Sequence, residues 1–69
     1  MRLSARNQLQ GTVISVDHGA VMSTVVLRLS GGQEVTAAIT RDAAEGLEIT
    51  VDETVTAIIK STEVMIGKD

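Results

Sequence analysis

The chain has 69 residues, a net charge of −3, a single His, and no Cys, Phe, Tyr or Trp. This composition excludes disulfides and thiolate metal sites, and it argues against nucleic-acid binding, which uses clustered Lys and Arg residues and aromatic stacking platforms. Because so short a chain forms one domain with a thin aliphatic core, we expect it to be stabilised by assembly into an oligomer.

Targeting and membrane signals are also missing. No apolar segment follows Arg2 as a signal peptide would require, and no apolar run approaches the ~20 residues of a membrane span. We therefore expect a cytoplasmic protein that does not enter a membrane. A lone His gives too few ligands for a transition-metal centre.

β-Branched residues in an alternating pattern predict strands along most of the chain. The five expected strands cover residues 8–16, 21–29, 34–40, 54–60 and 62–66. In the first strand, strict alternation places Leu9 and Val13 on one face and Ile14 and Val16 on the other. A turn at Asp17–Ala20 follows this strand.

One helical segment interrupts the strands. Thr40 is a candidate N-cap, and the helix formers after it end at Gly46, which predicts one or two helical turns within Thr40–Leu47. Five short strands and one helical turn favour an all-β fold, a five-stranded OB-fold-like barrel that is closed or partly open. The chain has no Pro to protect its edge strands, so strand pairing between subunits is expected.

Catalytic residues are hard to find in this sequence. His18 lies in a predicted turn without an obvious partner, and we interpret it as a solvated turn residue. The carboxylates are scattered, and no spacing matches a nucleophile elbow, a metal-binding helix or a Walker loop. Ser30–Gln33 (SGGQ) is a weak phosphate-loop signal and a much better hairpin turn. The protein is therefore not expected to be an enzyme.

Two short stretches carry the chemistry that remains. SARNQ at residues 4–8 and KST at residues 60–62 each join one cation, Arg6 or Lys60, to Ser or Thr hydroxyls. A tetrahedral dianion needs such a set, because cations neutralise its charge and hydroxyls donate directional hydrogen bonds. From the residues alone, the alternative that Arg6 and Lys60 are ordinary surface cations stays open.

The same residues resemble a known family. SARNQL followed by GTV, AAIT at residues 37–40 and VTAIIKSTEVMIG at residues 55–67 are similar to the molbindins, single-domain Mop proteins that bind molybdate and tungstate. Related TOBE/Mop domains occur in molybdate regulators and importers. The resemblance covers nearly all of residues 1–69. It implies a barrel with strands exchanged between subunits, a homohexamer built as a trimer of dimers, and cytoplasmic storage and buffering of the oxyanion without catalysis or an organic cofactor.

The resemblance also implies which residues bind the oxyanion. The main site would take Ser4 and Arg6 from one subunit and Lys60 and Ser61 from another, with Thr40 contributing from the end of the third strand. Ala43 stands where some relatives have a further hydroxyl. No metal ion would be ligated directly. A second oxyanion site would lie at the first turn and use Gly19, Ala20, Val21 and Met22.

An alternative function also fits the resemblance: a free-standing regulatory module that senses the oxyanion and signals by binding another protein. A third class, an OB-fold nucleic-acid binder, is disfavoured by the net charge and by the missing aromatic residues.

Overall fold

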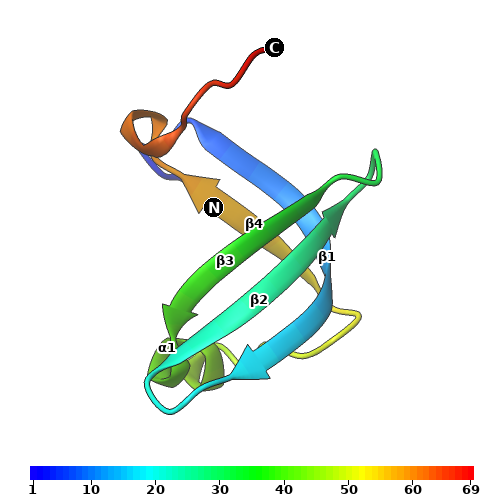
Figure 1. Ribbon diagram of the computed structural model, residues 1–69. Coiled ribbons are helices and arrows are strands. Elements are labelled where there is room, and N and C mark those ends of the chain that lie inside the picture. Colours follow the sequence, from blue (N-terminus) through cyan, green and yellow to red (C-terminus); the bar gives the residue numbers. More distant parts are fainter.

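The computed structural model describes all residues from Met1 to Asp69 and forms one curled antiparallel sheet (Figure 1). The sheet has four strands in the order β3-β2-β1-β4. The elements are β1 (Asn7–His18), β2 (Met22–Leu29), β3 (Glu34–Thr40), α1 (Arg41–Gly46), β4 (Thr54–Ile59) and the 3₁₀ helix η1 (Ser61–Glu63). The predicted all-β class and the short helix are therefore confirmed.

The long central strand β1 organises the sheet. Its first half pairs with β4, from Asn7 opposite Ile59, and its second half pairs with β2, ending with His18 opposite Ser23. A β-bulge between Val13 and Ser15 breaks the alternation of faces. Val13 is consequently buried in the core, and Val16 packs against the same core. The predicted placement of these two valines on opposite faces is wrong, because strict alternation does not survive a bulge.

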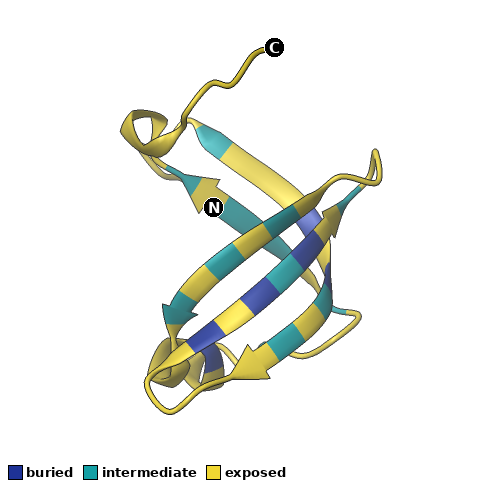
Figure 2. Ribbon diagram, in the orientation of Figure 1, coloured by how far each residue is buried: buried dark blue, intermediate teal, exposed yellow.

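The core of the isolated chain is small. Six of 69 residues are buried, and the central cluster consists of Val13, Val25 and Leu27 (Figure 2). Ala44 of α1 is also buried, which fixes the helix against the end of the sheet. So few buried side chains leave a domain of this size only marginally stable by itself.

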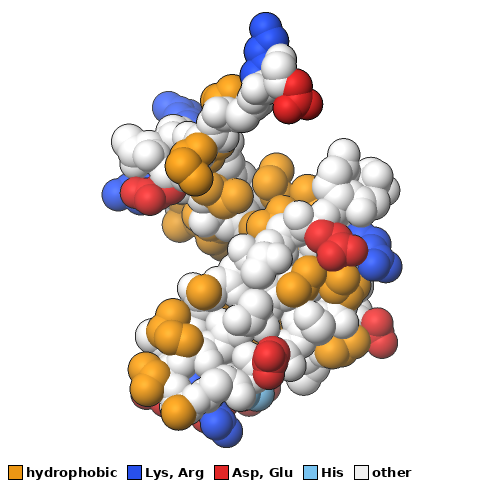
Figure 3. Space-filling model, in the orientation of Figure 1, with side chains coloured by type: hydrophobic (Ala, Val, Ile, Leu, Met, Phe, Trp, Pro, Cys, Tyr) orange, Lys and Arg blue, Asp and Glu red, His pale blue; other side chains and the backbone are white.

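The sheet curls into a half-barrel that does not close. β3 and β4 are the two edges, and an apolar cleft of about 410 Å³ lies between them, as the hollow lined by hydrophobic side chains in Figure 3 shows. Eleven of its thirteen lining residues are hydrophobic, among them Val35, Ile39, Ile49 and Val55. Side chains that a closed barrel would bury therefore still face solvent.

The predicted fifth strand at residues 62–66 is wrong for the single chain. Residues 61–63 form η1, and the segment after it is extended but pairs with no strand. Met65 and Ile66 are 92% and 90% exposed, so nothing in the same chain covers them. A strand needs a neighbour for its backbone hydrogen bonds, and this chain brings none to its own tail. Neither α1 nor η1 has the length and hydropathy that crossing a lipid bilayer requires.

Candidate functional site

A small pocket of about 210 Å³ brings the two predicted motifs together in one chain. It is lined by Ser4, Ala5, Arg6, Lys60, Ser61 and Thr62. Four of the five residues predicted for the main site are in this set. Thr62 was not predicted to bind, although its hydroxyl belongs to the same KST stretch.

The pairing of β1 with β4 explains this pocket. Asn7 lies opposite Ile59, so the residues just outside the ladder, Arg6 and Lys60, emerge side by side from the same end of the sheet. The Asn7 side chain fixes the corner by donating a hydrogen bond from Nδ2 to the Ile59 carbonyl at 3.1 Å. Gln8 Nε2 donates to the Ala5 carbonyl at 3.0 Å and holds the incoming segment.

The charge in this pocket is uncompensated. The structure has two ion pairs, Arg28 with Glu34 and Arg41 with Glu45, and neither involves Arg6 or Lys60. Three hydroxyls accompany the two cations. Like charges side by side repel, and hydroxyls with cations supply donors in excess of acceptors. This arrangement can bind and neutralise an anion that accepts several hydrogen bonds.

Thr40 lies far from this pocket within the same chain. It is opposite Met22 at the end of the sheet that carries α1, whereas the pocket is at the other end of β1 (Figure 1). β1 has 12 residues, and its 11 steps of about 3.3 Å give a length along the strand of roughly 36 Å between these two ends of the sheet. One oxyanion cannot contact both ends. Thr40 Oγ1 accepts the Ala43 N–H at 3.1 Å and so caps α1, which leaves its own O–H free to donate.

The predicted division of the main site between subunits therefore needs a correction. The sequence placed Ser4 and Arg6 on one subunit and Lys60 and Ser61 on another. The structure brings all four together in a single chain, because β1 and β4 are neighbours in the sheet. Thr40 is the residue that one chain cannot add to its own pocket.

The turn predicted as a second site, residues 19–22, connects β1 to β2 and is held by backbone and side-chain bonds. The Gly19 N–H donates to the Met22 carbonyl at 2.7 Å, and the Arg41 N–H donates to the Val21 carbonyl at 2.8 Å. Arg41 Nη1 also donates to the Gly19 carbonyl at 3.3 Å. This turn therefore has a neighbouring cation that sequence reasoning missed, because Arg41 follows the turn by about twenty residues and reaches it through the β2–β3 pairing.

Two side chains near this turn, His18 and Arg41, make hydrogen bonds to other side chains. His18 is the last residue of β1, and its Nδ1 is hydrogen-bonded at 2.6 Å to the Oγ of the buried Ser23. The prediction of a turn histidine without a partner is therefore wrong, because β1 continues two residues further than expected. Arg41 Nε donates to Glu45 Oε1 at 2.7 Å, and this hydrogen bond and charge lower the pKa of the Glu45 carboxyl.

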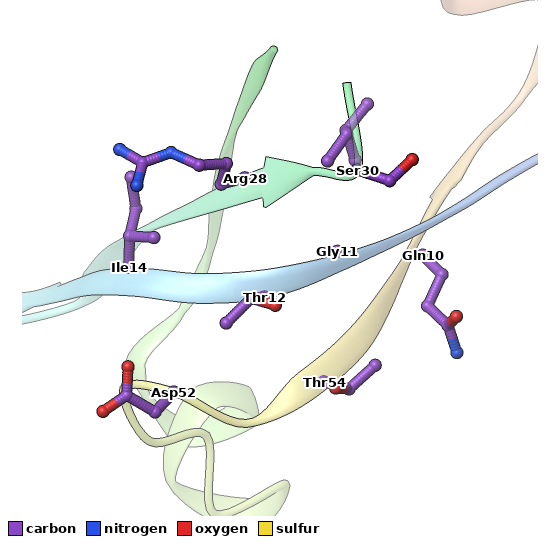
Figure 4. A pocket seen from close by; sticks show the side chains of 9 residues that line it. Gln10, Gly11, Thr12, Ile14, Arg28, Ser30, Asp52 and Thr54 are labelled. Atoms are coloured by element: carbon purple, nitrogen blue, oxygen red, sulfur yellow. The ribbon is translucent and has the colours of Figure 1, made fainter. Parts of the chain in front are cut away.

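A larger polar cavity of about 490 Å³ lies elsewhere on the sheet (Figure 4). Its charged side chains do not point toward one another, since Arg28 of β2 and Asp52, just before β4, lie on opposite sides of β1 in Figure 4. Arg28 is already paired with Glu34 at 3.2 Å, and Asp52 would repel an anion. The cavity is therefore a poorer anion site than the smaller pocket.

Comparison with known proteins identifies the class. The TOBE domain family matches residues 3–66, and the chain belongs to this family. It is 48% identical over 66 residues to the molybdenum-pterin-binding protein 3 of Clostridium pasteurianum, covering 96% of this chain and 97% of the relative. It is 52% identical over 65 residues to the molybdenum transport protein ModE of Herbaspirillum seropedicae, covering 94% of this chain but only 24% of that longer protein.

A solved structure agrees with these relatives. The fold matches that of a molybdate-binding protein from Sporomusa ovata with a TM-score of 0.92 and 38% identity, covering 99% of this chain and all of that one. The resemblance to the molbindins in the sequence is thus confirmed. These relatives are named as binding or transport proteins, and none of the three is named as an enzyme.

Proposed function

We propose that this protein binds molybdate, and tungstate by the same chemistry, in the pocket that Arg6 and Lys60 share. The observation that carries the proposal is the pairing of two cations, free of any carboxylate partner, with three hydroxyls in one small pocket. A tetrahedral dianion neutralises both charges and accepts hydrogen bonds in several directions. The names of the relatives, which include molybdenum or molybdate, support the same ligand.

The ligands we assign to this site are Ser4, Arg6, Lys60 and Ser61 from one chain and Thr40 from a neighbouring chain. Thr40 supports this division because its hydroxyl hydrogen is free and because it lies at the far end of its own sheet. The turn at residues 19–22 is proposed as a second oxyanion site, with Arg41 as the cation beside it.

The assembly we propose is a hexamer built from dimers that exchange strands. The tail after η1 is extended at Val64 and leaves Met65 and Ile66 almost fully exposed, while the apolar cleft between β3 and β4 lacks a strand. The tail of one chain pairing at the cleft of another would bury both surfaces and close the barrel. Such an exchange would also bring a second chain close to the pocket.

Storage and buffering of the oxyanion in the cytoplasm is the biological role we propose. The Clostridium relative, of which the chain matches 97%, is named as a binding protein, which supports a binding role. Its 40% identity to part of the transcriptional regulator ModE of Yersinia pestis favours oxyanion sensing as the second candidate. A partner protein that co-purifies with the hexamer only when molybdate is present would favour sensing.

The name of the Clostridium relative also includes pterin, so a pterin and the inorganic anion need to be compared directly as ligands. The chain has no aromatic side chain on which a pterin ring could stack, which favours the inorganic anion.

Native mass spectrometry with and without molybdate tests the proposal, because it reports the number of subunits and the number of bound anions together. We expect a hexamer that gains molybdate, with no comparable gain when chloride replaces it. A monomer, or a hexamer that binds no molybdate at millimolar concentration, would refute the assignment. Parallel titration with a soluble pterin should give no saturable binding.

A further inference from the structure

We infer that this pocket selects tetrahedral dianions that carry no proton, and that it rejects those that do. The inference rests on the proposed function, because it concerns the same pocket once a second chain has covered it. It adds a basis for selectivity that is chemical and is independent of the size of the anion.

No carboxylate lines the pocket, and each polar side chain in it can donate a hydrogen bond. Arg6 and Lys60 have N–H groups and no acceptor, and the other polar members are the hydroxyls of Ser4, Ser61 and Thr62. The sixth residue, Ala5, presents a methyl group. Glu63 follows Thr62 in η1 but does not line the pocket.

A protonated anion brings a donor into this set. At neutral pH, molybdate, tungstate and selenate carry no proton, whereas the dianions of phosphate and arsenate each retain one. That O–H needs an acceptor when water is excluded. A Ser or Thr hydroxyl can accept it only by turning its own hydrogen away, so the anion then loses one donated hydrogen bond.

The loss of one hydrogen bond to a charged group corresponds to roughly ten-fold or more in affinity. The cations cannot compensate, since both anions have the same charge and attract Arg6 and Lys60 equally. The second chain is expected to add another donor, the Thr40 hydroxyl. The acid closest to Thr40 in sequence is Asp42, in the first turn of α1.

Selenate and arsenate make a matched pair for the test above about pH 8.5, where both are dianions of nearly equal size and only arsenate retains a proton. The assembled protein is first titrated with molybdate, and each anion is then used to displace it at about pH 8.5. We expect selenate to compete at least ten-fold better than arsenate. Equal competition, or none from either anion, would overturn the inference, since size or charge alone would then decide.

Absence of molybdate binding in the first step would overturn the proposed function as well, so the two failures are distinguishable.

Thr62 is exposed, so a hydrogen-bond acceptor can be introduced there by substitution. Thr62→Asp should shift the selenate-to-arsenate ratio toward arsenate by about ten-fold relative to Thr62→Asn, which lacks the carboxylate. An unchanged ratio would count against the inference, and the wild-type ratio decides it if neither variant binds.

Asp42→Asn provides the control from the second chain. If the pocket's own lining sets the selectivity, this variant should keep the wild-type ratio within about two-fold. A large change would mean that Asp42 faces the anion, and the donor-only description of the site would be wrong.

Discussion

Mixing two defective subunits tests which residues of the site share a chain. Arg6→Ala removes a cation from the pocket. Thr40→Asp keeps an acceptor that can cap α1 but replaces the donor with a negative charge that repels the dianion. Each variant alone should bind molybdate at least ten-fold more weakly than wild type does, because it loses a charge-assisted hydrogen bond of about 1.5–3 kcal/mol. Thr40→Ser is the control, because it retains both the cap and the donor.

The expected recovery follows from the geometry. In the proposed site, Arg6, Lys60, Ser4 and Ser61 come from one chain and Thr40 comes from another. When the two variants are refolded together in equal amounts, random pairing should restore about a quarter of the sites to full affinity. Native mass spectrometry verifies the mixing, and titration with molybdate counts the tight sites.

A second mixture supplies the matched control. It combines Arg6→Ala subunits with Lys60→Ala subunits. Both residues line the same pocket of one chain, so every pocket in this mixture lacks one of the two cations. We expect no tight sites in that mixture. Recovery with Arg6→Ala and Lys60→Ala, together with none for Arg6→Ala and Thr40→Asp, would refute the assignment of the four residues to one chain.

Three further predictions follow from the charges and the open surfaces. Molybdate at ~100 times its Kd should stabilise the folded assembly by about 2.7 kcal/mol in thermal unfolding, and sodium chloride at equal ionic strength should not. Ile66→Asp should dissociate the hexamer in sedimentation experiments, whereas Lys68→Asp, in the same tail, should not; equal sedimentation of both would argue against tail exchange. Because Arg41 lowers the Glu45 pKa, the pair stabilises the fold above the ordinary Glu pKa of about 4.3, and this contribution is lost as pH falls through the lowered pKa. Denaturant unfolding of wild type and Glu45→Gln should therefore differ at pH 7 and converge at lower pH, and a constant difference would exclude this pair as the cause.

Much of the fold could be predicted from local sequence signals. Signals between neighbouring residues predict where β2 and β3 begin and end, the cap at Thr40 and the hairpin at Ser30–Gln33. The structure confirms the cap and the hairpin, and it confirms the strand ends to within one residue. The bulge after Val13 could not be predicted, because its position depends on the register between β1 and β2 rather than on either strand alone. The His18–Ser23 contact follows from the same β1–β2 register, and the Arg41 contact to the turn follows from the register between β2 and β3.

The sequence picks out four of the residues that line the pocket, but it does not place them on one chain. Arg6 and Lys60 are 54 positions apart, and pattern reasoning cannot tell whether such motifs meet within a chain or across an interface. The β1–β4 ladder decides this, because Asn7 opposite Ile59 leaves no freedom for the next residue on either strand. For the tail after η1, the apolar residues favoured a strand. A strand forms only beside another strand that pairs with its backbone N–H and C=O groups, and local sequence does not show whether such a neighbour exists.

The thin core, the open cleft and the unpaired cations have a common physical origin. A chain that buries six residues, exposes Ile66 and places two like charges side by side has surfaces that are unfavourable in water by themselves. The cleft and the tail can be satisfied by a second copy, but the cations cannot, because every copy brings the same positive charges to its own pocket. Only an anion removes that repulsion. Ligand binding and assembly should therefore be thermodynamically linked, so that an oxyanion bound between chains tightens the interface by the same free energy that the interface adds to binding.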